Sequence, residues 1–146
     1  MQSVGLAAFG PINPHTAVPS DAVAAFGEPS SVDRQGELCV DRWPDVGLTI
    51  DFSAAGDEDP CGADASIERI RVAGPAAADA GWRTAEGVRP GMSVAAVHRI
   101  YPEGYRGRAG TLVLVGAPEA SGSDARPVLV VTTAHGQVDA LIFPIG

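Results

Sequence analysis

The fold of this chain is decided by residues 39–61, CVDRWPDVGLTIDFSAAGDEDPC, which contain its only two cysteines. In the middle of this stretch, apolar and polar side chains alternate in the order Leu48, Thr49, Ile50, Asp51 and Phe52. A two-residue period is typical of a β-strand with one buried face and one wet face. The Pro-Asp pair at 44–45 favours a tight turn, so residues 37–43 and 46–52 are predicted to form a β-hairpin.

The two cysteines are predicted to form a disulfide, Cys39 to Cys61. Their separation in the sequence lets the hairpin return and bring both sulfurs within bridging distance. Closing such a loop stabilises the fold by about 3 kcal/mol. The alternatives are two unpaired buried thiols and a two-thiolate metal site, although no CxxC or nearby His pair supplies further ligands. A disulfide indicates an oxidising location, either extracellular or in the cell envelope.

Length and charge restrict the classes of partner. A chain of 146 residues is long enough for one ordinary domain. Its formal net charge of −8 repels phosphate backbones and anionic lipid, so we expect no nucleic acid partner. No segment approaches the roughly 20 apolar residues of a membrane span, and we expect no membrane insertion. The N-terminal MQSVGLAAFGPINP lacks the basic and long apolar regions of a signal peptide, so we expect no export signal within this sequence.

The order of elements predicts an α+β fold of two tandem pseudo-repeats, each a short helical segment packed on an antiparallel β-sheet. The first unit spans 1–74 and carries the disulfide, the second spans 81–146, and 75–80 form a Gly/Ala/Pro connector. Both units are expected to share one compact domain. Helices are predicted within 16–29 and 87–104, and further strands at 66–74, 110–116, 126–134 and 136–146. The segment 116–127 has the composition of an exposed, mobile loop.

The acidic segment DEDPCGADASIE, residues 57–68, resembles a calcium-binding loop of the EF-hand type. Asp57, Asp59 and Glu68 occupy the positions of carboxylate ligands. However, Cys61 stands where an oxygen ligand belongs, and the flanking segments have the pattern of strands where helices are required. A solvated acidic loop is the favoured interpretation, and a calcium-stabilised structural domain is kept as an alternative.

Sequence motifs for catalysis are absent: the chain has no GxSxG, HExxH, Walker loop or GxGxxG. No cofactor is predicted. The histidines, His15, His98 and His135, are widely spaced in the sequence. The alternative to a non-catalytic protein is a small hydrolase in which His98 or His135 acts as general base, with a carboxylate of the acidic loop to orient it.

The candidate partner-binding residues are large amphipathic and cationic side chains, which anchor protein interfaces when exposed: Trp43, Arg69, Arg71, Tyr101 and Tyr105. The alternative for the aromatic residues is packing in the core, especially for Trp82. Arg42, Arg69 and Arg71 are expected to share the wet face of the first sheet with Asp41 or Asp51, in a ladder of cross-strand charges.

Two units of helix plus sheet, a helix ending AAFGEP and the pattern C…WP..GL.I.F…PC together resemble small secreted actinobacterial proteins of the beta-lactamase-inhibitor-protein type. That fold is shared with the SmpA/OmlA outer-membrane assembly lipoproteins. The resemblance implies a non-catalytic module whose sheet binds another protein. It also implies a disulfide in each unit, whereas only the first unit here has cysteines. The sequence thus predicts a non-catalytic protein-binding module that is secreted or lies in the cell envelope. The resemblance implies inhibitor-like activity, and the sequence does not identify the partner.

Overall fold

One antiparallel β-sheet runs through the computed structural model, which describes residues 14, 16–84, 86–102, 105–106, 111–115 and 127–145. The order of its strands is β1-β2-β3-β4-β8-β7-β6-β5. The strands are β1 (Ser31–Gln35), β2 (Leu38–Trp43), β3 (Leu48–Ser53), β4 (Ser66–Ala73), β5 (Tyr105–Arg106), β6 (Thr111–Val115), β7 (Pro127–Ala134) and β8 (Gln137–Pro144). The helices are α1 (Pro19–Phe26), α2 (Gly74–Ala80) and α3 (Val94–Ile100), with a 3-10 turn, η1 (Pro44–Val46). This arrangement confirms the α+β class.

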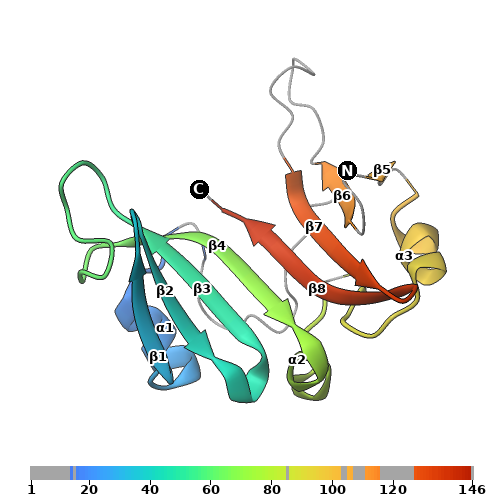
Figure 1. The fold of residues 1–146 in the computed structure, drawn as a ribbon, viewed down its shortest axis with the longest axis horizontal. Coiled ribbons are helices and arrows are strands. Elements are labelled where there is room, and N and C mark those ends of the chain that lie inside the picture. The colour runs from blue at the N-terminus through green and yellow to red at the C-terminus, as the bar shows by residue number, and fades with distance from the viewer. Residues whose placement is uncertain are drawn as a thin grey trace.

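The sheet joins two antiparallel meanders through their last strands (Figure 1). Strands β1 to β4 pair in chain order, as do β5 to β8, and β4 then pairs with β8. The residues expected for the first and second units therefore contribute to one continuous sheet.

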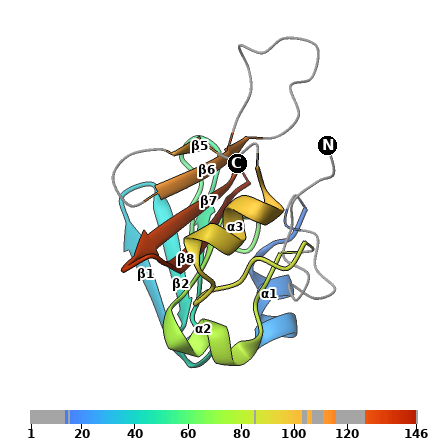
Figure 2. The same cartoon turned by 90° about the vertical axis from the view of Figure 1, so that its right-hand side faces the viewer.

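All three α-helices lie on the same side of the sheet, which leaves its other side without a helix among the described residues (Figure 2). The helix-covered side holds the core, where Leu48, Ile50 and Phe52 are almost fully buried. Their alternation with Thr49 and Asp51 follows the predicted two-residue period. Two indole N–H groups join the layers: Trp43 donates to the Gly27 carbonyl and Trp82 to the Val46 carbonyl, each at 2.9 Å.

Residues 75–80, expected as a Gly/Ala/Pro connector without a helix of their own, form most of α2. Pro75 stands in its first turn, where the missing N–H costs nothing. Gly81 ends the helix in the left-handed conformation, and its N–H reaches the carbonyls of Ala77 and Ala78. Seven residues rich in alanine have no apolar period to reveal a helix, since alanine serves on either face.

Strand β1 was not predicted from the sequence. Four of its five residues are exposed, so it lacks the alternation that marks a half-buried strand. The turn at 44–45 is the 3-10 turn η1, closed by Gly47 in the left-handed conformation. The predicted helices correspond to α1 and α3, whereas most of the loop expected at 116–127 lies outside the described residues.

No described helix has both the length and the apolar composition needed to cross a membrane.

Candidate functional site

The side of the sheet without helices is a candidate binding surface, which we name the open face. Leu48 and Ile50 point into the core, so Thr49 and Asp51 point to the opposite side. In an antiparallel sheet, residues that are directly paired share a face. The strand pairing therefore defines two rows across the open face: Arg42, Thr49, Arg71, Ile142 and Val130 in one, and Val40, Asp51, Arg69 and Pro144 in the other.

The open face carries three arginines, two of which are paired. Arg69 donates to the Asp51 carboxylate from Nε at 2.8 Å, and the Asp51 side chain is only 6% exposed. Arg42 pairs with Asp33 of β1 at 2.5 Å. Arg71 is exposed and has no hydrogen-bond or ion-pair partner among the described residues. Of the expected cross-strand charge ladder, the Arg69–Asp51 pair is present; Arg42 pairs instead with Asp33, and Arg71 is available to another molecule.

Two of the residues predicted to bind a partner are buried, which corrects that prediction. Trp43 is 5% exposed and lies on the helix side of β2, where it makes an edge-on contact with Phe26 of α1. Tyr101 is also 5% exposed. Its hydroxyl lies 2.8 Å from Thr84 Oγ1 and 2.9 Å from Glu86 Oε2. Neither side chain is available to contact a protein at the open face.

Burial raises the pKa of the Tyr101 hydroxyl, and its hydrogen bond to the Glu86 carboxylate raises it further. The phenol therefore stays protonated and donates to Glu86, while the Thr84 hydroxyl donates to it. Tyr105 lies in β5, where it pairs with Val113. The side chain of Tyr105 is outside the part of the structure that is described.

The predicted disulfide is confirmed: Cys39 and Cys61 are bonded, with their Cα atoms 5.1 Å apart. It fastens the segment between β3 and β4 to the core side of β2. Asp59 in that segment accepts a hydrogen bond from its own turn, at the N–H of Cys61, and it pairs with Arg34 of β1.

The calcium alternative is not supported by the arrangement of its three carboxylates. Asp59 is engaged by Arg34, and Glu68 accepts a hydrogen bond from Ser53 at 3.0 Å. Asp57 is exposed on the loop. Within the described ranges, these residues do not form a group that could hold a metal ion, and neither do any other three His, Cys, Asp or Glu side chains.

The histidine and carboxylate pair required by the hydrolase alternative is not assembled in the described part of the chain. His98 is on α3 and His135 in the turn between β7 and β8, at one end of the molecule (Figure 1). The acidic loop after β3 lies at the opposite end (Figure 1). The antiparallel pairing of β4 with β8 explains why: the acidic loop precedes β4, whereas His135 lies beside the far end of that strand. His15 is outside the described residues.

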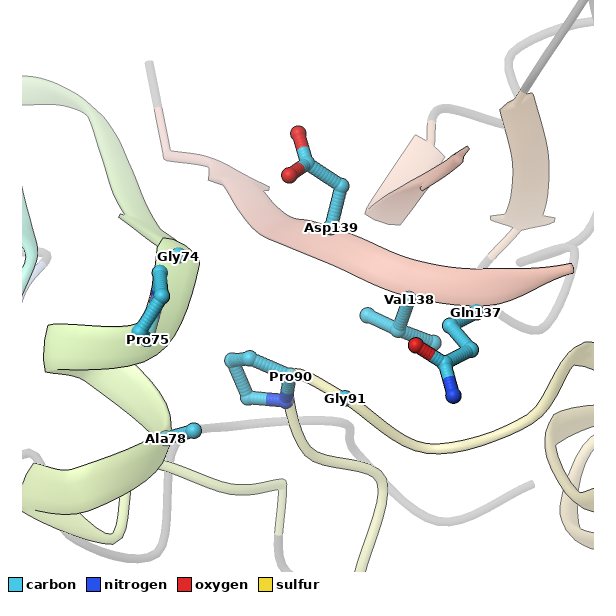
Figure 3. Close-up of a pocket in the computed structure, with 8 residues that line it drawn as sticks. All are labelled: Gly74, Pro75, Ala78, Pro90, Gly91, Gln137, Val138 and Asp139. Carbon is cyan, nitrogen blue, oxygen red and sulfur yellow. The ribbon is translucent and has the colours of Figure 1, made fainter. Parts of the chain in front are cut away.

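A cleft of about 210 Å³ separates α2 from β8. Pro75, Ala78, Pro90 and Val138 line it, and Asp139 projects from the other side of β8 (Figure 3). Most of the described lining is alanine, proline, glycine and valine, and Asp139 is its one charged residue, with the carboxylate directed away from Pro75, Ala78 and Pro90 (Figure 3).

A second cleft, of about 190 Å³, lies on the helix side of the sheet beside the disulfide. Asp41 of β2 lines it and is only 6% exposed. Burial raises the pKa of this carboxyl group to about 6. The sequence predicts Asp41 or Asp51 on the wet face, and only Asp51 is there. The two-residue period contained the signal, since Asp41 stands between Cys39 and Trp43 on one side of β2.

Comparison with known proteins gives no family for the chain: no protein-family model, curated protein or solved structure matches it significantly.

Proposed function

We propose that this chain is an exported, non-catalytic protein-binding module of the inhibitor-like type, whose partner lies against the open face of the sheet. The observation that carries the proposal is the open face itself: a multi-stranded surface with no described helix over it, and near its middle the exposed Arg71, which has no partner among the residues that the structure describes. A sheet face that is not covered by the chain's own helices is a surface on which another molecule can pack.

The disulfide supports export, because such bonds persist in oxidising compartments and are rare in the cytosol. A pair of tandem units also fits the topology. Each part of the chain has helix followed by a meander of strands, and the last strand of each meander meets the other at the centre. We propose on this basis that the units are pseudo-repeats, as in the proteins that the sequence resembles.

Charge indicates what the partner presents. The chain is strongly acidic overall, with a formal net charge of −8, yet Arg42 and Arg71 flank Thr49 on the open face. Ile142 and Val130 continue the same row as apolar neighbours. The complementary surface is one with an acidic side chain to meet Arg71 and an apolar patch beside it, because unlike charges set register and orientation at interfaces.

A photo-crosslinking amino acid in place of Thr49 tests the proposal. Added to culture supernatant and envelope extract of the native host, the labelled protein is expected to give a discrete crosslinked band. Excess unlabelled protein should compete that band away, and Arg71→Glu in the labelled protein should weaken it about tenfold, as loss of an interfacial charge pair does. The same label in place of Asp79, exposed on α2, is the matched control and should give no band.

Two results would count against the proposal: no competable band from position 49, or bands of equal strength from both positions. Inhibition is tested on the crosslinked partner once it is identified by mass. If that partner is an enzyme, adding the unlabelled wild-type module should reduce its activity. Adding the Arg71→Glu variant in its place should leave more of that activity.

A further inference from the structure

The cleft beside the disulfide has the construction of a small-ligand site, and it is separate from the open face. Its walls come from the start of α1, the segment after α1, strands β1 to β3 and the disulfide loop. Most of the lining is apolar, from Pro19, Val23, Pro29, Val32, Phe52 and Pro60. Val32 is 53% exposed at the rim, which is unusual for a large apolar side chain of this protein. The cleft is therefore open to solvent and suited to an aliphatic group.

Asp41 is an unsatisfied carboxylate in this cleft. Within the described ranges, its one polar contact is with the sulfur of Cys39, 3.7 Å from Oδ1. That sulfur is part of the disulfide, so it carries no hydrogen and cannot donate one. Among the described residues no other group donates a hydrogen bond to Asp41. A buried carboxylate without a donor is costly to a fold, and such groups are normally paired.

We propose that this cleft binds a protonated primary amine on an aliphatic stem, with the ammonium group donating to Asp41 and the stem lying on the apolar lining. An ammonium supplies both the donors and the positive charge that Asp41 lacks. Glu28, the other charged residue of the lining, adds a second negative charge. The chain has no lysine, so none of its own side chains supplies this amine; the sources to be distinguished are a free alkylamine and the lysine side chain of a second protein.

The charged groups around Asp41 preserve this preference for a cation. From β1, Arg34 lies on the same side of the sheet as Asp41, but it is paired with Asp59 of the disulfide loop. On α1, Asp21 is exposed and accepts from the N–H of Val18. Strand β3 places uncharged Ile50 opposite Asp41. No described cation is therefore bonded to Asp41, and binding should follow its ionisation, with a pKa of about 6.

Two probes test the site on the intact, oxidised protein: n-butylammonium and Nα-acetyl-lysine N-methylamide, titrated near pH 8 and followed by amide NMR. Saturable shifts are expected at Val32, Cys39 and Phe52. Binding should weaken about tenfold or more in Asp41→Asn, the loss typical of a charged hydrogen bond. Asp79→Asn removes an equal charge from α2, outside the cleft, and should bind as the wild type does. Tighter binding of the lysine derivative than of butylammonium would identify a protein side chain as the source; the reverse would identify a free amine.

Lowering the pH of the wild type to about 5 protonates Asp41 without any substitution, so binding should weaken there as well. This second measurement holds even if Asp41→Asn perturbs the fold. The proposal is overturned if neither probe gives saturable shifts, if neutral 1-butanol binds as tightly as butylammonium, or if affinity is the same near pH 8 and pH 5. None of these results bears on crosslinking at the open face, so the two proposals fail separately.

Discussion

Asp41 is a charged side chain at a buried position of the kind that normally holds an apolar residue. Its neighbours on the same side of β2, Cys39 and Trp43, are core residues with 1% and 5% exposure. A carboxylate in that position loses its hydration and gains no donor from the described chain, which is why burial raises its pKa. A leucine at this position would avoid that cost, and it could not bind a cation.

Replacing Asp41 should change how stability depends on pH. The pKa of Asp41 is about 6 in the folded chain, against an ordinary value of 3.8 for a solvated aspartate. Between these values the folded chain holds a proton that the unfolded chain has lost, so the free energy of unfolding falls as pH rises through this window and stays lower above it. Asp41→Asn should remove this fall and stabilise the protein near pH 8 by about 1–3 kcal/mol. Urea denaturation near pH 4, 6 and 8 measures it.

Asp79→Asn is the control for that experiment, since Asp79 is exposed on α2 and should leave the pH profile unchanged. An unaltered fall in stability in Asp41→Asn would show that the profile arises from other groups.

Tyr101, unlike Asp41, is a buried residue whose polar atom has hydrogen-bond partners. Its hydroxyl joins Thr84 and Glu86, and Thr84 Oγ1 also accepts from the N–H of Val88 at 3.0 Å. Tyr101→Phe should lower the free energy of unfolding by about 1–2 kcal/mol, because the buried Thr84 hydroxyl loses its acceptor. Thermal melting checks this. Glu86→Gln keeps an acceptor for Tyr101 and should cost less; an equal cost would contradict the hydrogen-bond explanation.

At the scale of elements, the approach of η1 to α2 depends on Gly47. Its φ of 66° is left-handed, and a Cβ there would lie 2.5 Å from the Ala73 carbonyl oxygen and 2.6 Å from the Ala77 nitrogen. Gly36 has φ of 63° but open space around it. Gly36→Ala should therefore cost only the conformational penalty, about 1–2 kcal/mol, whereas Gly47→Ala should cost clearly more. Denaturant midpoints of the two variants measure the difference, and equal losses would contradict the clash.

The disulfide ties the loop after β3 to β2, and its contribution should appear mainly in the unfolded state. Closing a loop of this length restricts the unfolded chain, so replacing both cysteines by alanine should destabilise the fold by about 3 kcal/mol. Chemical denaturation of the double variant measures this loss. The single variants are less informative because each leaves a reactive thiol. A double variant as stable as the wild type would show that loop closure contributes nothing here.

For the whole molecule, the pairing of β4 with β8 is the link on which both parts of the chain depend. Residues 14–80 alone would expose the edge of β4 together with Ile70 and Val72, which are buried in the intact sheet. Such a fragment should be unfolded or self-associated, because unpaired strand edges recruit other strands. Light scattering and circular dichroism test this, and mixing with residues 81–146 should restore a one-to-one complex. A monomeric, cooperatively folding fragment would contradict it.

Sequence patterns predicted the elements whose own residues repeat with the right period. Leu48, Ile50 and Phe52 identified β3, and Ile70 and Val72 identified β4, since one face of each strand is buried. The separation of the cysteines predicted their bond. Arg69 and Asp51 were expected to share a face and do, as an ion pair. Local sequence was sufficient for the strands because their alternating residues lie within one element. The disulfide and the ion pair could then be predicted by placing those strands side by side.

The amino-acid sequence by itself therefore determined the strands with alternating side chains, two of the helices, the disulfide and the α+β class. Only the tertiary structure decided that β1 is a strand, that 75–80 belong to a helix, that Trp43 and Tyr101 are buried, and that Asp41 lines a cleft. Each of these depends on what a residue meets from distant parts of the chain. An edge strand exists through its pairing partner and a buried side chain through what covers it, and neither is recorded in local sequence.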